Sequence, residues 1–413
     1  MGKVIILVDK NGLGITAKSA DGNSLIIGNG YAVVGGVQLD VAYAFRRLAD
    51  AEDIGITAAN DTANNMLVHY HIDEYFRKAP GTKLWFMPVA TGETLEDLVG
   101  VAGDVLQSLA GEVRNLGFIS NKTDVEMGAL TIVDGLPEEV GDAISAASIL
   151  WEDQRTRNRP LACILIEGFK FSGTPGSAAD LRANEATGVG VVIAQDTDIV
   201  FGSKLSVKHH AAVGTALGVK AGRTVETNIG ETEGNDLQDK ALGRWINPGL
   251  SSNTLASALN DDPNASDYDL LTEKGYIFPR AYQGYPGVFF DDDPSCDLAT
   301  SDFYSLSNTA VYVKAHREIY ASLVGEVNKK IFIDTASGNI TAADCARFEN
   351  LGNDVIGATG FMTRAAEISG GKTFCDPNQN VLGTSEVKVA YEIVPVGYSR
   401  AIRGSISFTK KIS

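Results

Sequence analysis

The feature that most constrains this chain is a pair of strand-like segments close to its end. Apolar residues alternate with polar or small ones over Val387–Ile393, and the alternation resumes over Ile402–Phe408, after Pro395 and Gly397. A period of two places every second side chain on one face of a β-strand, so each segment is expected to have one covered face. A strand at the end of a chain is an edge strand unless another strand pairs with it, and monomeric proteins usually protect such edges.

The beginning of the chain has the same character, with a continuous apolar run over Val4–Val8 that is typical of a buried strand. Unpaired strand-like segments at both ends predict a subunit that adds strands to the sheets of its neighbours, which is β-augmentation. The residues expected to form these inter-subunit strand arms are Val4, Ile5, Ile6, Leu7, Val8, Ile402, Ile406 and Phe408.

Composition narrows the class of protein. The 413 residues are 44% hydrophobic and 21% charged, which predicts a globular protein of two or three domains. A net charge of −17 argues against a nucleic-acid binder, which needs a basic surface, and against docking on an anionic membrane. The run Val4–Val8 is too short for the core of a secretion signal, and no apolar run approaches the length of a membrane span. Four cysteines without a CxxC pair predict reduced thiols in a cytosolic product.

Strand and helix patterns alternate from Gly22 onward, which favours an α/β sheet covered by helices. The predicted strands include Leu25–Ile27, Lys83–Pro88, Leu161–Ile166 and Gly190–Ile193, and the predicted helices include Gln38–Ala51, Met66–Phe76, Thr94–Asn115 and Pro137–Asn158. Residues Ser206–Gly222 form a predicted helix of small residues, suited to close packing. The pattern changes from Leu270 onward: we predict a long helix over Asn308–Lys330, a short one from Thr341 to Gly352, another over Asp354–Ile368, and the terminal hairpin.

Two glycine-containing segments resemble nucleotide sites only superficially. The segment GGKT at Gly370–Thr373 lacks the glycine that a phosphate loop needs, because Ala366 stands at that position, so we interpret it as a helix end and turn. Gly28-Asn29-Gly30 follows a strand, but Val33 stands where a dinucleotide fingerprint has its third glycine. A tight strand-to-helix turn is the better interpretation.

No metal or catalytic arrangement is convincing. His69 and His71 diverge on the predicted helix, so we interpret them as surface histidines, and the adjacent His209 and His210 cannot face one ion together. His316 lies on an apolar helix stripe, as expected for a core or interface histidine. The run Asp291–Asp293, with Asp297, lacks the spacing of a calcium loop and is interpreted as a solvated turn. We therefore predict a protein that is not an enzyme and has no cofactor, metal or catalytic residue.

The last third of the chain resembles the assembly domain of contractile tail sheath proteins from contractile-tailed phages and related injection particles. The resemblance rests on ordered segments: Leu270–Asp293, Ser301–Lys330, ITAADCARFENLGNDVIGATGF, the turn FCDPNQN at Phe374–Asn380, and the closing strands EVKVAYEIVPVGYSRAIRGSISF. The start of the chain and AAVGTALG at Ala211–Gly218 are similar to a compact subgroup catalogued as an uncharacterised phage family. The chain departs from better-known sheaths at Lys274–Arg280, where KGYIFPR replaces their Trp-Gly-Asn-Arg stretch.

This resemblance implies an α/β (α+β) fold in which an outer α/β domain, residues 21–268, is inserted into an assembly domain. The assembly domain would comprise the N-terminal arm, residues 1–20, and residues 269–413 with the C-terminal arm. It also implies a structural subunit that stacks as hexameric rings around an inner tube and contracts by rigid-body rearrangement. Its expected partners are copies of itself, the inner tube protein, and baseplate and terminator proteins, with assembly in the bacterial cytoplasm into a virion tail or injection particle. Two alternatives stay open: another structural part of such a particle, and a nucleotide-dependent α/β enzyme.

Overall fold

The computed structural model describes residues 20–172, 174–199, 205–252, 254–255, 266–400 and 402. The chain divides into two compact units, Met1–Glu318 and Ile319–Ser413. The predicted domain boundaries at residues 20/21 and 268/269 remain predictions. The predicted arm residues Val4–Val8, Ile406 and Phe408 lie outside the described residues.

A twisted, mainly parallel sheet forms the centre of the first unit. Among the described residues it has seven strands in the order β12-β8-β7-β4-β1-β3-β2. Their bounds are β1 Ser24–Asn29, β2 Tyr43–Phe45, β3 Leu84–Val89, β4 Asn115–Ile119, β7 Cys163–Glu167, β8 Val189–Val192 and β12 Tyr276–Ile277. All neighbours pair in parallel except β2, which runs antiparallel to β3 at one edge. Every residue of β1, β3, β4 and β7 is buried, as expected for parallel strands covered on both faces.

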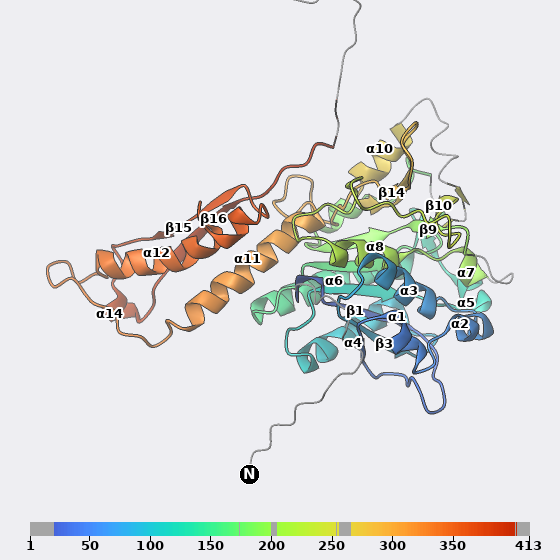
Figure 1. The fold of residues 1–413 in the computed structure, drawn as a ribbon, viewed down its shortest axis with the longest axis horizontal. Helices are drawn as coiled ribbons and strands as arrows, with labels where there is room; N and C mark the ends of the chain where they lie inside the picture. The colour runs from blue at the N-terminus through green and yellow to red at the C-terminus, as the bar shows by residue number, and fades with distance from the viewer. Residues whose placement is uncertain are drawn as a thin grey trace, which may run out of the picture. The chain divides into compact units, whose positions relative to one another are not determined.

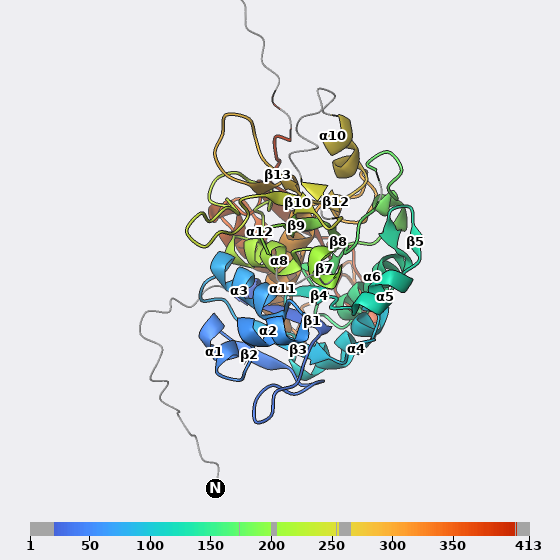
Figure 2. The ribbon, with the colours of Figure 1, turned by 90° about the vertical axis from the view of Figure 1, so that its right-hand side faces the viewer.

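Helices cover the two faces of this sheet, which confirms the predicted α/β alternation (Figure 2). The helices α4 (Leu95–Ser108) and α6 (Glu138–Thr156) cover one face, and α3 (Val68–Lys78) and α8 (Val213–Gly222) cover the other. Along β1, Leu25 and Ile27 pack into the first layer, while Ile26 points into the second. This alternation follows from the pleat of the strand.

Glycine lets α8 pack directly against the backbone of α3. Gly214, Gly218 and Gly222 are spaced by four, so they share one face of α8. A Cβ atom at Gly214 would lie 2.2 Å from the carbonyl oxygen of His71, and one at Gly222 would lie 2.4 Å from that of Lys78. The single helix predicted over Ser206–Gly222 is wrong, because residues 209–212 separate α7 (Leu205–Lys208) from α8 (Val213–Gly222). The predicted close packing is confirmed for α8.

Shorter elements connect the layers of the first unit (Figure 1). They are η1 Ala20–Gly22, α1 Leu48–Glu52, α2 Ala58–Asn64, α5 Asp124–Ala129, β5 Ile132–Val133, β6 Leu136–Pro137, η2 Leu181–Asn184, β9 Ala194–Asp196, α7 Leu205–Lys208, β10 Pro248–Leu250, β11 Thr254–Leu255, α10 Ser266–Glu273, β13 Pro279–Arg280 and β14 Phe289–Phe290.

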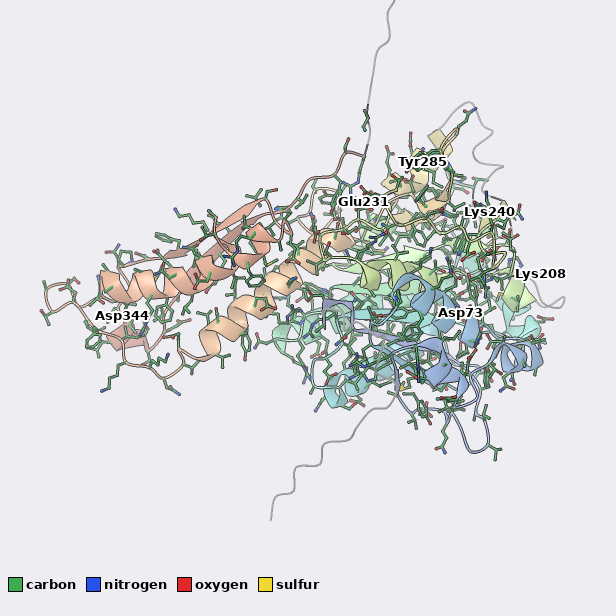
Figure 3. All side chains as sticks on the ribbon, in the orientation of Figure 1. Asp73, Lys208, Glu231, Lys240, Tyr285 and Asp344 are labelled. Atoms are coloured by element: carbon green, nitrogen blue, oxygen red, sulfur yellow. The ribbon has the colours of Figure 1, made fainter. Side chains whose placement is uncertain are left out.

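In the second unit, helix α12 (Ala342–Ile356) packs against a two-stranded antiparallel sheet. The unit begins within α11 (Leu306–Val324) and continues with α12 Ala342–Ile356, α13 Phe361–Arg364, β15 Gly370–Cys375, α14 Val381–Thr384 and β16 Val389–Val394. Thr341 caps α12 as predicted, because its hydroxyl oxygen accepts a hydrogen bond from the amide of Asp344. The carboxylate of Asp344, labelled in Figure 3, also accepts a hydrogen bond of 2.7 Å from the amide of Phe332 and so ties the preceding loop to the helix start.

Several predicted elements differ from the structure. Residues Gln38–Ala51 do not form one helix: Tyr43–Phe45 pairs with β3 as an edge strand, and the helix α1 begins only at Leu48. Pairing with an existing sheet has overridden the helical pattern of this segment. The helix predicted to reach Asn115 ends at Ser108, where Ala110 and Gly111 adopt left-handed conformations.

The end of the chain differs in a similar way. The helix α12 continues through Gly352 to Ile356. The predicted helix Asp354–Ile368 is therefore not a separate element, since its first three residues end α12 and, beyond them, only Phe361–Arg364 is helical. Thr373 and Tyr391 pack so closely against position 352 that a larger residue would not fit, which explains the glycine inside this helix. The strand β16 is confirmed within Val387–Ile393, but among the described residues it pairs with β15 and not with a following strand.

Candidate assembly interface

The antiparallel pair β15–β16 is the central feature of the second unit. The strands pair from Gly370↔Val394 to Cys375↔Val389. In β16 the side chains of Val389, Tyr391 and Ile393 are half-buried while those between them are exposed, so one face of the pair lies against α12. A two-stranded sheet is only marginally stable in water, and three or more strands are usually needed around a hydrophobic face.

Side chains of α12 occupy the outer edge of β15. The amide of Thr373 donates to the side-chain oxygen of Asn353 at 2.9 Å, and the amide of Cys375 donates to the carboxylate of Glu349 at 3.0 Å. Asn353 and Glu349 lie one turn apart on α12, so they reach two alternate amides of the strand. These two amides therefore point away from β16.

The outer edge of β16 has no such protection among the described residues. Thr373 stands opposite Tyr391, and Cys375 stands opposite Val389. In an antiparallel pair, the backbone N–H and C=O groups of two opposed residues either point toward each other or both point outward. The backbone groups of Val389, Tyr391 and Ile393 therefore point outward, and no described strand pairs with them. An open row of donors and acceptors of this kind is a template for another strand.

A hollow of about 700 Å³ lies beside this open edge. Its apolar lining comes from the end of α11, the loop after it, α12, α14, and β16 with the segment before it: Leu323, Val327, Ile331, Ile333, Phe348, Val381, Leu382, Val387, Val389 and Tyr391. A strand added to β16 would cover part of this lining and bury its apolar side chains.

The second unit buries few apolar side chains and exposes several large ones. One buried cluster contains Ile340, Cys345, Phe348, Cys375 and Val381, and the other buried apolar residues described there are Ile319, Val355, Ile356, Met362 and Ile368. By contrast, Val327 is 69% exposed, Phe332 is 71% exposed and Leu382 is 79% exposed. Clustered exposure of this kind marks an interaction surface more often than a free one.

The predicted arm residues can be placed only in part. Ile402 is described, is 89% exposed and lies in no strand. The other predicted arm residues, which are Val4, Ile5, Ile6, Leu7, Val8, Ile406 and Phe408, lie outside the described residues. The acceptor edge is not predicted from the sequence, because Gly370–Thr373 is interpreted there as a helix end and turn, whereas these residues begin β15. The alternation of Thr373 and Cys375 with Lys372 and Phe374 was the available signal for a strand there.

The carboxyl edge of the large sheet is the place where an α/β enzyme would bind its ligand. Strand order reverses around β1, and such a switch point commonly binds nucleotides. Here the side-chain amide of Asn29 donates to the backbone carbonyl of Ala90, and the side-chain amide of Asn121 donates to the backbone carbonyl of Asn29 at 2.8 Å. The polar groups at this edge therefore tie the loops of the protein to one another.

The glycines near this edge serve strand packing. Gly28 lies so close to Ile119 of β4 that a Cβ atom would be 2.1 Å from its side chain, and one at Gly30 would be 2.7 Å from Pro88. The predicted tight strand-to-helix turn is wrong, because β1 is followed by a loop and by β2, and helix α1 begins at Leu48.

Glu167 ends β7 at the same edge and is fully buried. Its carboxylate accepts hydrogen bonds from the amides of Ser120 at 2.5 Å and Ala211 at 2.8 Å. Burial raises the pKa of this carboxyl from 4.5 to about 8 even though both hydrogen bonds oppose the rise.

This raised pKa predicts a pH dependence of stability. Between pH 4.5 and about 8 the folded protein holds a proton on Glu167 that the unfolded chain has lost. The free energy of unfolding should therefore fall as pH rises through this window, by up to about 1.4 kcal/mol per pH unit. Urea unfolding at several pH values should show this slope, and Glu167→Gln should flatten it. An identical slope in both proteins would contradict the assignment to Glu167.

The histidines are structural in their contacts. His69 and His71 do lie on a helix, but both are buried, so their interpretation as surface histidines is wrong. His71 accepts a hydrogen bond from the amide of Gly214, and burial lowers its pKa to about 3. His210 is buried and donates to the carbonyl of Val207. His316 is half-buried beside the ring of Tyr312.

The aspartate run is part of the interior rather than a solvated turn. Asp292 and Asp293 are buried, and the amide of Asn228 donates to both carboxylates. The amide of Ser307 donates to Asp293 at 2.9 Å, and Arg280 pairs with Asp291 at 2.5 Å. In the part of the chain that the structure describes, no three His, Cys, Asp or Glu residues are placed to hold a metal ion. No helix there is long and apolar enough to cross a membrane.

Comparisons with known proteins assign a family and a fold. Residues 1–294 match the sequence family DUF2586, N-terminal domain, and residues 302–413 match DUF2586, C-terminal domain. No curated protein matches the chain.

Three solved structures share its fold along nearly the whole length. The anti-feeding prophage helical sheath in the contracted state is 11% identical, with a TM-score of 0.60 and coverage of 99% of both chains. The sheath complex of an extracellular contractile injection system, PVC, in the contracted state is 10% identical, with a TM-score of 0.53 and coverage of 100% of this chain and 98% of that one. The sheath tail protein from Desulfitobacterium hafniense is 7% identical, with a TM-score of 0.53 and coverage of 96% of this chain and 100% of that one. At these identities the likeness shows a shared fold.

Proposed function

The chain belongs to the DUF2586 family, and we propose that it is the structural subunit of a contractile sheath. The observation that carries this proposal is the open outer edge of β16 beside an apolar hollow, in a chain with the fold of sheath proteins. The sheath subunits would stack as hexameric rings around an inner tube and contract to drive that tube through a target envelope.

Donated strands would hold the polymer together. The segments Val4–Val8 and Ile402–Phe408 have the strand pattern that an acceptor edge needs, and the second unit leaves such an edge open. Each donated strand would form several backbone hydrogen bonds, each worth about 0.5–1.5 kcal/mol net. A head-to-tail contact that does not close on itself produces a helical filament, which is the architecture of a sheath.

Contraction would use two packings of the same rigid subunits. Packed interfaces tend to switch between discrete arrangements, so the extended sheath would be metastable and the contracted one more stable. The free energy would then come from burying subunit faces rather than from nucleotide hydrolysis. The partners of such a subunit are its own copies, an inner tube protein, and baseplate and terminator proteins, with assembly in the bacterial cytoplasm into a virion tail or injection particle.

A second candidate is another structural part of the same kind of particle. It is favoured by the likeness to a chain in the anti-feeding prophage baseplate, which has a TM-score of 0.60 at 11% identity. Subunits of that kind would occupy one ring rather than a long filament.

Negative-stain electron microscopy of the purified chain tests the proposal directly. Striated hollow tubes are expected, because one subunit would carry both the donor strands and the acceptor edge. Single rings would favour the second candidate. A stable monomer that binds a nucleotide saturably and melts at a higher temperature with it would refute both structural roles.

A further inference from the structure

Two cysteines of the second unit lie in contact. Cys345 is in the first turn of α12 and Cys375 is the last residue of β15, and their sulfur atoms are 3.1 Å apart. We propose that Cys345 and Cys375 form a site of oxidation at which an intramolecular disulfide joins α12 to β15.

The backbone already holds the two residues in the required register. The amide of Cys375 donates to Glu349, which lies one turn after Cys345 on α12, and the amide of Thr373 donates to Asn353 one turn further on. A disulfide needs a sulfur separation of about 2.05 Å, so the sulfur atoms must approach by about 1 Å. Side-chain rotation supplies this movement while the two hydrogen bonds keep helix and strand in place.

The other two cysteines provide an internal comparison. Cys163 in β7 contacts the side-chain oxygen of Asn115 at 3.4 Å, and Cys296 lies in a bridge with Ala186. All four thiols are free and buried, and among the described residues only the pair in the second unit has its sulfur atoms in contact. Oxidation should therefore be selective for that pair.

The chemistry balances with a low-molecular-weight disulfide such as oxidised glutathione as the oxidant. One protein thiolate attacks a glutathione sulfur and releases one glutathione thiol, and the second protein thiolate then displaces the other glutathione. The two protein thiols lose two protons and two electrons, which are recovered in the two reduced glutathione molecules.

The reaction should be slow in the folded protein at neutral pH. Burial and the neighbouring sulfur of Cys345 raise the pKa of Cys375 to about 12, so little of the reactive thiolate is present. Raising the pH from 7 to 8.5 should accelerate oxidation by at least tenfold, because the attack requires the thiolate.

The bond would strengthen the region that carries the open edge. It would close a loop of 30 residues that contains the rest of α12, α13 and the start of β15. Constraining a loop of this length should raise the melting temperature of the oxidised protein by roughly 5–10 °C. This inference does not depend on whether the chain polymerises.

The test is to incubate the full-length chain with excess oxidised glutathione at pH 8.5, with and without sub-denaturing urea. The protein is then unfolded in excess N-ethylmaleimide, which blocks every remaining thiol, and is digested without reduction for mass spectrometry. The expected product is a peptide pair linked through Cys345 and Cys375, lighter than the two thiol peptides by two hydrogen atoms. Cys163 and Cys296 should be recovered as maleimide adducts in the sample without urea.

Matched variants separate pairing from general reactivity. Cys163→Ala and Cys296→Ala should still form the linked peptide, whereas Cys345→Ser should leave Cys375 as a glutathione adduct or a free thiol. Recovery of Cys345 and Cys375 as separate adducts in the wild-type chain, both with and without urea, would overturn the proposal.

Discussion

A chain that ends at Gly397 is expected to fold like the full-length protein and to form no tubes. The buried cluster of the second unit contains Ile340, Cys345, Phe348, Cys375 and Val381, and none of the apolar residues packed around it lies beyond Val389. The other buried apolar residues described in this unit also lie before Val389. Removing residues 398–413 therefore takes away no part of this core, whereas it removes the predicted donor segment Ile402–Phe408.

The expected loss of assembly is large because every contact in the polymer would lose a strand. Three to five backbone hydrogen bonds amount to about 1.5–7.5 kcal/mol, which weakens each contact by roughly 10- to 300,000-fold. Circular dichroism should show an unchanged melting curve, while sedimentation and electron microscopy should show small particles only. Long tubes from the truncated chain would contradict strand donation by this arm.

Proline substitutions in β16 test the acceptor side of the same contact. The amide of Ile393 points outward, so Ile393→Pro removes no bond to β15 but blocks an added strand. The matched control is Glu392→Pro, whose amide faces Lys372 of β15, and which should destabilise the second unit by about 3 kcal/mol. We expect Ile393→Pro to be folded and unable to polymerise. Normal tubes from that variant would show that this edge accepts no strand.

The parts of the fold that the sequence predicted are those with strong local patterns. Lys83–Pro88 and Leu161–Ile166 are continuous apolar runs in a parallel sheet, and Val389–Val394 keeps a period of two. Each of these patterns reports burial on one or both faces of a single element. A local window is therefore sufficient to find it.

The parts that could not be predicted depend on residues far apart in the chain. Asp292 and Asp293 form a polar run that is expected in solvent, yet Asn228 satisfies both carboxylates in the interior. Residues Gly370–Cys375 become a strand because Asn353, Glu349 and β16 complete their hydrogen bonds. The acceptor edge also depends on contacts between residues far apart in the chain. The sequence therefore predicted the donor segments but not the strand edge that would receive them.

Replacing the contact glycines of α8 is expected to cause the largest loss of stability in the first unit. A Cβ atom at Gly214 would lie 2.2 Å from the carbonyl oxygen of His71, and one at Gly218 would lie 2.8 Å from that of Tyr75. These neighbours are backbone atoms of α3, so a helix must move rather than a side chain. Gly214→Ala or Gly218→Ala should each lower the free energy of unfolding by about 2–3 kcal/mol, despite the better helix propensity of alanine.

The displacement would also disturb the polar contacts that join α3 to its surroundings. The buried carboxylate of Glu74 on α3 accepts hydrogen bonds from Thr215 of α8 at 2.9 Å and from the indole of Trp245 at 3.0 Å. Gly141→Ala in α6 is the matched control, because its added Cβ would meet no atom within 4 Å apart from its chain neighbours and the nearby backbone of its own helix, and it should stabilise the protein by about 0.5–1 kcal/mol. Denaturant unfolding of the three variants measures the difference. Equal effects at Gly141 and Gly214 would mean that α8 does not rest on the backbone of α3, and the spacing of its glycines would then need another explanation.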